Sequence, residues 1–281
     1  MGEKTRFHNK ITKALNTYKR IQVNEYALRA WEDVRQFVEI CIATQPIRIH
    51  DEKKEGLFYH TKRPAATIDN SKISQEEGLS YALFNSREIL NLDTKIIGYE
   101  AYLLRQPQKF SNAIGVKCDL VAYDPKKFEL TAIEVKKKAL EESTKIEFGM
   151  LQAKAYGYML TRLHAMKYNL LKQHIAYCLE SNYSNYKNFD GKIQKISFAL
   201  AAPKSYFTDS LRNNSQLQSF LEPLEKTYFT LGFGGYWVID DDCVKNIKGT
   251  GNGKKCIPEF DKCGNNQIQI YKSFVKLKNG L

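Results

Sequence analysis

No stretch of this 281-residue sequence is apolar for the roughly 18 residues that a membrane-spanning helix needs. The first twenty residues are charged throughout and contain no apolar segment like that of a secretory signal. The six cysteines form no Cys-x-x-Cys pair, and a chain of this size can bury a core without a disulfide framework. These absences predict an intracellular, cytoplasmic protein, with the nucleoid as one compatible location, and no membrane partner.

Ligands for zinc are also scarce. The five histidines are scattered without ligand spacing, so we assign them no role. Cys243, Cys256 and Cys263 lie far apart along the chain, and no histidine near them completes a set of four ligands. Three unrelated thiols are therefore a better interpretation than a zinc site.

Positive charge is present in excess, with 43 lysines and arginines against 31 acidic residues and a net charge of +12. Such a balance favours a polyanionic partner, and DNA is preferred because the sequence shows no basic amphipathic anchor or lipidation motif. The tail 243–281 is especially rich in lysine, glycine and asparagine. Two interpretations of it stay open: a flexible loop that contacts the DNA backbone, or a loop that is merely solvated.

Hydrophobic periodicity predicts the order of the elements. The first seventy residues are expected to be largely helical, and Ser74 with Glu77 forms a capping-box pattern that predicts the start of a further helix. Strands are expected over 94–104, 116–124, 128–138, 192–203 and 232–240, and helices over 148–183 and 211–229. This order predicts a mixed α/β sheet flanked by helices, divided into a helical region 1–70, a core 71–240 and a basic C-terminal extension 241–281.

Two adjacent strands of this predicted core carry acidic residues. Successive side chains of a strand point to opposite faces, so Glu134 and Lys136 share one face and Val135 points away. If the two strands pair as neighbours, Asp119 approaches the same edge. Two carboxylates and a backbone carbonyl, that of Val135, make an oxygen-rich site for Mg²⁺ or Mn²⁺. Lys136 would hold a water molecule or stabilise negative charge developing on a phosphate.

Asp119, followed across a short hairpin by Glu134-Val135-Lys136, resembles the core motif of the PD-(D/E)XK nuclease superfamily. Gln152 and Tyr156 in "GMLQAKAYGYM" are similar to the Gln-x-x-x-Tyr motif of its RecB-like members, and the order of elements resembles that of NucS-type endonucleases. The resemblance covers roughly residues 73–165. It implies a restriction-endonuclease-like fold in which the aspartate and the glutamate bind a divalent metal and the lysine assists the attacking water. Cys118 stands where the superfamily has its namesake proline.

The helix that begins with "EEGLSYAL" resembles the one that supplies a further acidic residue in this superfamily. Glu76 lies on the same stripe as Leu79 and Leu83, whereas Glu77 already has a role in the capping box. Glu76 is therefore the preferred candidate, with Glu77 as the alternative. Glu100 is a third candidate, although it is more typical of an ordinary strand residue.

The resemblance implies a magnesium-dependent deoxyribonuclease, an endonuclease of restriction, phage defence or repair, with double-stranded DNA as the favoured substrate. A homodimer would suit double-strand cutting, because two sites must address two strands. Gln152 and Tyr156 would form a polar pair near the metal or the DNA backbone, and Lys137 and Lys138 would contact phosphate unless they are simply solvated.

A non-catalytic nucleic-acid-binding protein that kept the fold is the alternative function, and a protein-interaction module is a third. The choice of DNA or RNA, and of endo- or exonuclease action, stays open.

Overall fold

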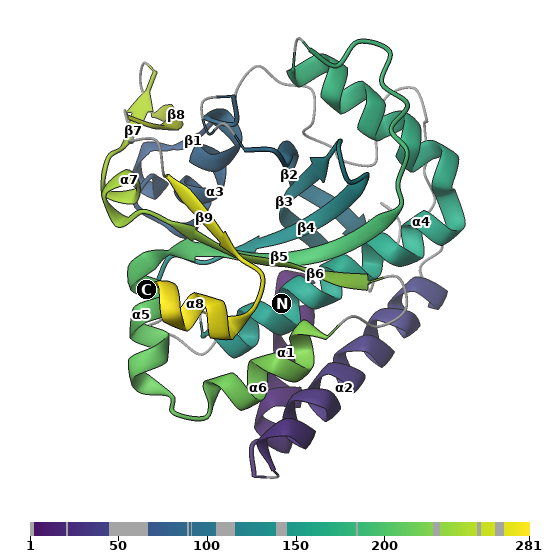
Figure 1. The fold of residues 1–281 in the computed structure, drawn as a ribbon, viewed down its shortest axis with the longest axis vertical. Helices are drawn as coiled ribbons and strands as arrows, with labels where there is room; N and C mark the ends of the chain where they lie inside the picture. The colour runs from purple at the N-terminus through teal and green to yellow at the C-terminus, as the bar shows by residue number, and fades with distance from the viewer. Residues whose placement is uncertain are drawn as a thin grey trace.

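The centre of the molecule is a six-stranded mixed sheet with the strand order β2-β3-β4-β5-β6-β9 (Figure 1). The computed structural model describes residues 3–20, 22–44, 67–88, 90, 92–104, 116–138, 145–183, 185–226, 231–251, 254–261 and 267–281. The strands are β2 (Lys95–Leu104), β3 (Val116–Asp124), β4 (Glu129–Val135), β5 (Lys195–Pro203), β6 (Leu231–Ile239) and β9 (Ile268–Tyr271). No helix among these residues is long and apolar enough to cross a membrane.

The first three strands, β2, β3 and β4, form an antiparallel meander. β5 and β6 run parallel to β4, and β9 pairs antiparallel with β6 at the far edge. Every residue of β4 and of β6 is buried, because helices or further strands cover both faces of the sheet. The carboxyl ends of three neighbouring parallel strands consequently meet at one edge.

A layer of helices covers one face of the sheet. It comprises α1 (Glu3–Tyr18), α2 (Val23–Thr44), α4 (Ile146–Asn182), α6 (Leu217–Glu225) and α8 (Phe274–Gly280), whose apolar residues share one large core with the sheet (Figure 1). α4 is the crossover between β4 and β5 and runs for 37 residues, with a kink at Lys167 where φ is −141° and ψ is 41°. α5 (Lys204–Asn213) follows directly after β5.

A smaller unit covers the opposite face. The helix α3 (Glu76–Asn85) packs there with a three-stranded sheet of order β1-β8-β7. Asn85 Nδ2 donates to the carbonyl of Pro258 at 2.9 Å, and the N–H of Phe260 donates to Ser86 Oγ at 2.9 Å. The remaining elements of this unit are β1 (Ile68–Asp69), the one-turn helix η1 (Asn70–Lys72), α7 (Asp241–Lys245), β7 (Ile247–Thr250) and β8 (Lys255–Phe260).

The predicted mixed α/β sheet flanked by helices is confirmed, including the antiparallel pairing of β3 with β4. The capping box was wrong: Gln75 occupies the N-cap of α3 without a side-chain hydrogen bond, and Glu77 instead forms an ion pair with Lys72 at 2.9 Å. The helix predicted over 211–229 corresponds to the end of α5 and to α6, with residues 214–216 between them.

The two predicted additions to the core are part of the same packing unit as the core itself. Phe7 of α1 and Phe274 of α8 belong to one apolar cluster with the central sheet. The tail was also predicted to be a loop, and this was wrong for its described residues, because β7 pairs antiparallel with β8 and β9 joins the main sheet. Its glycines and lysines lower the sequence signal for strands, whereas tertiary pairing decides the structure.

Candidate metal centre

Three carboxylates from three elements converge at the edge where β4 ends. Glu76 is the first residue of α3, Asp119 lies in β3, and Glu134 is the penultimate residue of β4. One oxygen of each lies within 4.8 Å of the others. Glu134 is buried, and the other two are partly exposed, so the cluster lies where the protein meets solvent and not deep in the core.

The pairing of β3 with β4 explains two of these positions. Leu120 is paired with Ile133, and continuing that antiparallel register by one residue places Asp119 opposite Glu134. The N–H of Val135 donates to Asp119 Oδ2 at 2.8 Å, which fixes this carboxylate at the end of the ladder. The side chain of Val135 itself packs in the apolar cluster around α3, on the face away from Lys136.

Asp119 lies at an irregular point of its strand. Cys118 packs in the core under α4 and Leu120 in the core under α3, although residues two apart in a regular strand share a face. The chain therefore changes face around Asp119, and its carboxylate lies in neither apolar cluster. Burial raises the pKa of the Cys118 thiol well above its usual value, so this cysteine is an inert packing group.

Lys136 lies among the carboxylates and is itself only 3% exposed. Its Nζ is 2.5 Å from Glu134 Oε1 and 3.4 Å from Glu76 Oε1. Gly149, in the first turn of α4, lies against the lysine stem: a Cβ at this position would be in ordinary contact with Lys136 Cγ at 3.5 Å and closer, at 3.1 Å, to Leu200 Cδ1. Glu134 and Lys136 thus share a face of β4, as the alternation of the strand predicted.

Among the described residues, the cluster brings three carboxylates together with one buried ammonium group. Burial raises the pKa of Glu134 well above its usual value, and the charge of Asp119 adds to the shift while Lys136 opposes it. Burial lowers the pKa of Lys136, but the three carboxylates outweigh that effect and raise it, so the ammonium group stays protonated. The cluster thus retains an excess of negative charge that a divalent cation would neutralise.

A buried atom without a partner points in the same direction. Glu134 Oε2 is buried and accepts no hydrogen bond within the described part of the chain. Buried carboxylate oxygens are normally paired or bound to a metal. The side-chain atoms that could bind a metal here are all carboxylate oxygens. Such ligands fit Mg²⁺ or Mn²⁺ and not a soft metal.

Gln152 and Tyr156 of α4 lie beside the carboxylates. Gln152 Nε2 donates to Tyr156 Oη at 2.6 Å, and it also lies 3.2 Å from His8 Nε2 of α1. Burial raises the pKa of Tyr156, and the charges of Glu134 and Asp119 add to the shift. Sequence reasoning missed His8, because 144 residues separate it from Gln152 and no spacing pattern links them.

The other acidic candidates are not members of this three-carboxylate group. Glu77 pairs with Lys72, and Glu100 lies 3.4 Å from Lys117 in a left-handed conformation with φ of 44°. Lys137 is partly exposed and Lys138 exposed, just past the end of β4. Cys243 and Cys256 are buried in the apolar cluster around α3, and Cys263 lies outside the described residues.

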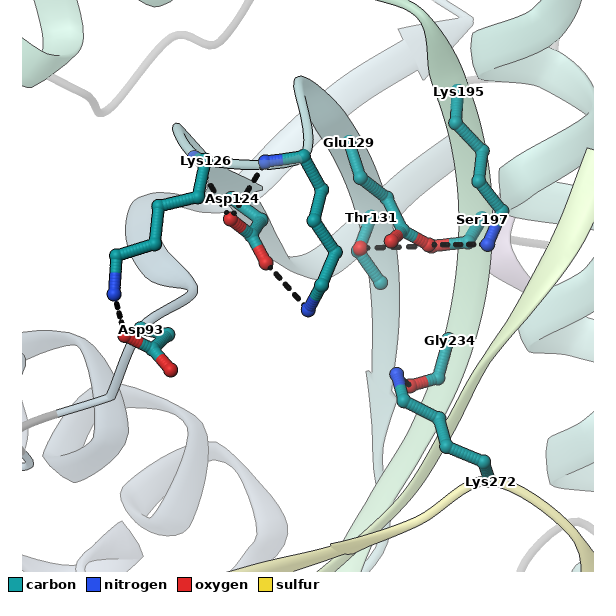
Figure 2. Close-up of polar contacts among 10 residues, drawn as sticks. Asp93, Asp124, Lys126, Glu129, Thr131, Lys195, Ser197, Gly234 and Lys272 are labelled. Atoms are coloured by element: carbon teal, nitrogen blue, oxygen red, sulfur yellow. Dashed lines mark hydrogen bonds and ion pairs between the residues drawn. The ribbon is translucent and has the colours of Figure 1, made fainter.

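The opposite end of the sheet, where β3 turns into β4, has a different polar arrangement (Figure 2). Asp124 Oδ1 accepts from the N–H groups of Lys126 and Lys127, and Oδ2 lies 3.0 Å from Lys127 Nζ. Nearby, Glu129 pairs with Lys195 at 3.1 Å. The same region holds the hydroxyl pair of Thr131 and Ser197 at 2.8 Å, the exposed ion pair of Lys126 with Asp93, and a bond from Lys272 Nζ to the carbonyl of Gly234.

Comparison of the chain with protein-family models, with curated proteins and with solved structures finds no match.

Proposed function

We propose that this protein is a metal-dependent nuclease that hydrolyses phosphodiester bonds in DNA, as an endonuclease on a restriction-endonuclease-like core. The observation that carries the proposal is the meeting of Glu76, Asp119 and Glu134 within 4.8 Å of one another, with a buried lysine among them. The sequence motif supports the same conclusion, because its aspartate, glutamate and lysine are the residues that come together. The basic balance of the chain, +12 overall, suits a polyanionic substrate.

Asp119, Glu134 and Glu76 would hold the Mg²⁺ or Mn²⁺ ion, with the backbone of Val135 beside them. The ion supplies Lewis-acid polarisation of the phosphoryl oxygen and a water molecule of lowered pKa. Glu76 belongs to the set and Glu77 does not, since only Glu76 lies within ion-pair distance of Lys136. The fixed N–H of Val135 keeps Asp119 oriented toward the cluster.

Lys136 acts as a charged donor in this proposal. Its pKa is raised by the carboxylates around it, which keeps the ammonium protonated and unsuited to remove a proton from water. Two of its three N–H bonds suffice for Glu134 and Glu76, and the third remains for the attacking water or for a phosphate oxygen. A preorganised donor of this kind stabilises negative charge that develops in the transition state.

Gln152 bonds to Tyr156 and lies 3.2 Å from His8 of α1, and this polar set would orient the water or the DNA backbone. Lys137 and Lys138, which follow the metal-binding strand directly, would contact phosphates. An intracellular enzyme of restriction, phage defence or repair, acting on duplex DNA as a homodimer, is the biological role that we propose with this chemistry.

The test is cleavage of supercoiled and linear DNA with Mg²⁺, with Mn²⁺ or with EDTA. Asp119→Asn and Glu134→Gln should reduce cleavage by more than the roughly 10²–10³-fold cost of losing one preorganised group. Asp124→Asn is a matched control, since it makes the same chemical change in the same strand at the end that carries no acidic cluster. Its activity should equal that of the wild-type protein.

Cleavage that survives both Asp119→Asn and Glu134→Gln would remove the proposed site. Metal-dependent binding of DNA without cleavage under any of these conditions would favour the non-catalytic alternative. Circular dichroism and thermal unfolding of each variant establish that a lost activity is not a lost fold.

A further inference from the structure

Glu100 of β2 has a backbone conformation that is rare for its residue type. Its φ is 44°, in the left-handed region, where the Cβ of any residue other than glycine crowds the following carbonyl. Among the described residues of β2 and β3, it alone has a positive φ. Residues in this region persist only where their surroundings fix them, and such residues cluster at functional sites. The conformation therefore needs a cause in the folded protein.

Glu100 lies in the same cross-strand row as two members of the acidic cluster. The register of β2 with β3 pairs Tyr99 with Leu120 and has no shift at the next residue, so Glu100 lies opposite Asp119. On its other side, Asp119 lies opposite Glu134 of β4. The left-handed residue is therefore the direct neighbour of the central carboxylate in this row.

The strand β2 changes face at Glu100. The ring of Tyr99 contacts that of Tyr81 in α3, with centroids 5.0 Å apart. The next side chain faces the same helix: burial raises the pKa of Tyr81, and the charges of Glu100 and Glu77 raise it further. Ala101, one residue later, packs in the core under α4. In a regular strand, successive side chains such as those of Tyr99 and Glu100 point to opposite faces.

The strand β3 changes face in the same row. Leu120 packs with Tyr99 in the apolar cluster around α3, whereas Cys118 packs with Ala101 in the core under α4. Asp119 lies between these two pairs and has no positive φ of its own. Because the strands are joined by ladder hydrogen bonds, a change of face in one is matched in the other. The left-handed residue in β2 thus accounts for a carboxylate of Asp119 that lies in neither apolar cluster.

Contacts of the side chain help to hold Glu100 in this conformation. Glu100 Oε2 lies 3.4 Å from Lys117 Nζ of β3. The hydrogen bond to Glu77 raises the pKa of Lys72, and the charge of Glu100 contributes to the same shift. The carboxylate of Glu100 therefore faces lysines, and it is not a member of the three-carboxylate group.

We propose that Glu100 is a positioning residue of the metal centre, whose left-handed backbone sets the change of face that directs the Asp119 carboxylate to the metal. The inference rests on the proposed function and adds to it a residue that acts through Asp119 without touching the ion. The site then requires the backbone conformation at position 100 and not the carboxylate there. A protein with a regular strand at this position binds metal only in the fraction of molecules that adopt the left-handed form.

Glycine and alanine at position 100 separate the role of the backbone from that of the side chain. Glu100→Gly and Glu100→Ala remove the same carboxylate, but only glycine adopts a positive φ without steric cost. Mn²⁺ binding to the full-length protein is followed by the electron paramagnetic resonance signal of the free ion, with wild type and Asp119→Asn as references. We expect Glu100→Gly to bind within about twofold of wild type. Glu100→Ala should bind about 5- to 30-fold more weakly, as the cost of the left-handed conformation implies.

Two further comparisons guard against a general loss of structure. Phe128→Ala is the matched control, because Phe128 also has a positive φ, of 52°, at the opposite end of the same two strands. It should lower the urea midpoint of unfolding and leave Mn²⁺ affinity unchanged. Glu100→Asn and Glu100→Gln repeat the test with two amides, of which asparagine tolerates a positive φ better. Glu100→Asn should therefore bind Mn²⁺ more tightly than Glu100→Gln.

Cleavage in Mg²⁺ gives a readout that a merely structural role would not move. Saturating Mg²⁺ draws Glu100→Ala into the form that binds the ion, because the ion binds only that form. The Mg²⁺ concentration for half-maximal rate should therefore rise in this variant, while kcat at saturation should return to that of wild type.

The outcomes separate this inference from the proposed function. Equal losses of Mn²⁺ affinity in Glu100→Gly and Glu100→Ala, wild-type affinity in both, or an equal loss in Phe128→Ala would overturn the positioning role, and metal-dependent cleavage would leave the nuclease standing. Weaker binding by Glu100→Ala than by Glu100→Gly, without cleavage under any metal, would support the positioning role and overturn hydrolysis. A wild-type protein that binds Mn²⁺ no better than Asp119→Asn would overturn both the metal centre and the positioning role.

Discussion

β3 and β4 carry acidic side chains at both of their ends, and the two ends are built in opposite ways. At the hairpin end, Asp124 has Lys127 and two backbone N–H groups, and Glu129 has Lys195 (Figure 2). At the other end, Lys136 pairs with both Glu134 and Glu76, and Asp119 lies beside them. The first end is balanced by groups of the chain itself, whereas the second keeps an excess of negative charge.

In the function that we propose, the carboxylates at the first end have a structural role and those at the second end a functional one. Folding stability favours pairing each buried charge, because a buried charge without a partner is costly. Natural proteins depart from that rule mainly at sites that bind or react, where stability is given up for function. The acidic cluster around Glu134 is such a departure, within the same two strands that obey the rule at their other end.

Removing Lys136 from the acidic cluster should have the largest effect on the free energy of unfolding. Lys136→Met removes the buried ammonium group that pairs with Glu134, and loss of one partner from a buried ion pair costs about 3–5 kcal/mol. Lys127→Met, the matched change at the paired end, removes a lysine that is 66% exposed and should cost at most about 1 kcal/mol. Urea unfolding of the two variants measures the difference.

Mg²⁺ sharpens that experiment, because an ion that binds the folded state stabilises it by mass action. It should restore part of the stability of Lys136→Met and leave Lys127→Met unchanged. Equal losses in the two variants, or equal responses to Mg²⁺, would show that the two ends do not differ.

Asp124→Ala should have the next largest effect. The carboxylate is buried and accepts from two backbone N–H groups that would be left without it, at a cost of about 1–3 kcal/mol. Burial raises the pKa of Asp124, but the Lys127 ammonium group and the two N–H groups outweigh this and lower it. The stabilisation is therefore present above the pKa of the unfolded chain and disappears as the pH falls through the folded value.

The wild-type protein and Asp124→Ala should accordingly differ in stability at pH 7 and converge as the pH drops below about 4, near the pKa of a free aspartate. Thermal unfolding at a series of pH values gives the comparison. If the difference in stability between the two proteins stayed constant as the pH fell, Asp124 would stabilise the turn without its charge.

The hydroxyls of Thr131 and Ser197 are hydrogen-bonded to each other, so their contributions to stability should depend on each other. Thr131→Val or Ser197→Ala alone leaves one buried hydroxyl without its partner and should cost about 1–2 kcal/mol, while the double variant should cost less than the sum of the two. Additive single effects in a double-mutant cycle would show that the two side chains do not depend on each other.

The smallest effect belongs to the ion pair of Lys126 with Asp93, which is exposed on both sides. Lys126→Ala should leave the urea midpoint of unfolding unchanged within error at ordinary salt concentration. A measurable loss that salt does not reduce would show a packing role for the lysine stem.

The sequence was informative where structure depends on neighbours along the chain. Alternation placed Glu134 and Lys136 on one face, and the short hairpin brought Asp119 opposite them. Local pattern also favoured Glu76 over Glu77, although the capping-box argument that accompanied this preference was wrong. The catalytic roles of these residues stay predictions until cleavage is measured.

Long-range packing accounts for what the sequence did not reveal. His8 reaches Gln152 because α1 packs under α4, and no periodicity encodes that contact. The strands β7 and β8 are short and contain Gly249 and Pro258, residue types that are depleted in strands, which hides their pairing from propensity arguments.

The hydrogen bonds between β8 and the C-terminal end of α3 have a consequence for synthesis of the protein. Asn85 and Ser86 make contacts that span 173 and 174 residues, so their partners leave the ribosome roughly 9–35 seconds later at ordinary rates of translation. The strands that carry Asp119 and Glu134 emerge well before that. During synthesis the strands that bear Asp119 and Glu134 are therefore available before the strand that supports the helix bearing Glu76, and this support of α3 is added later.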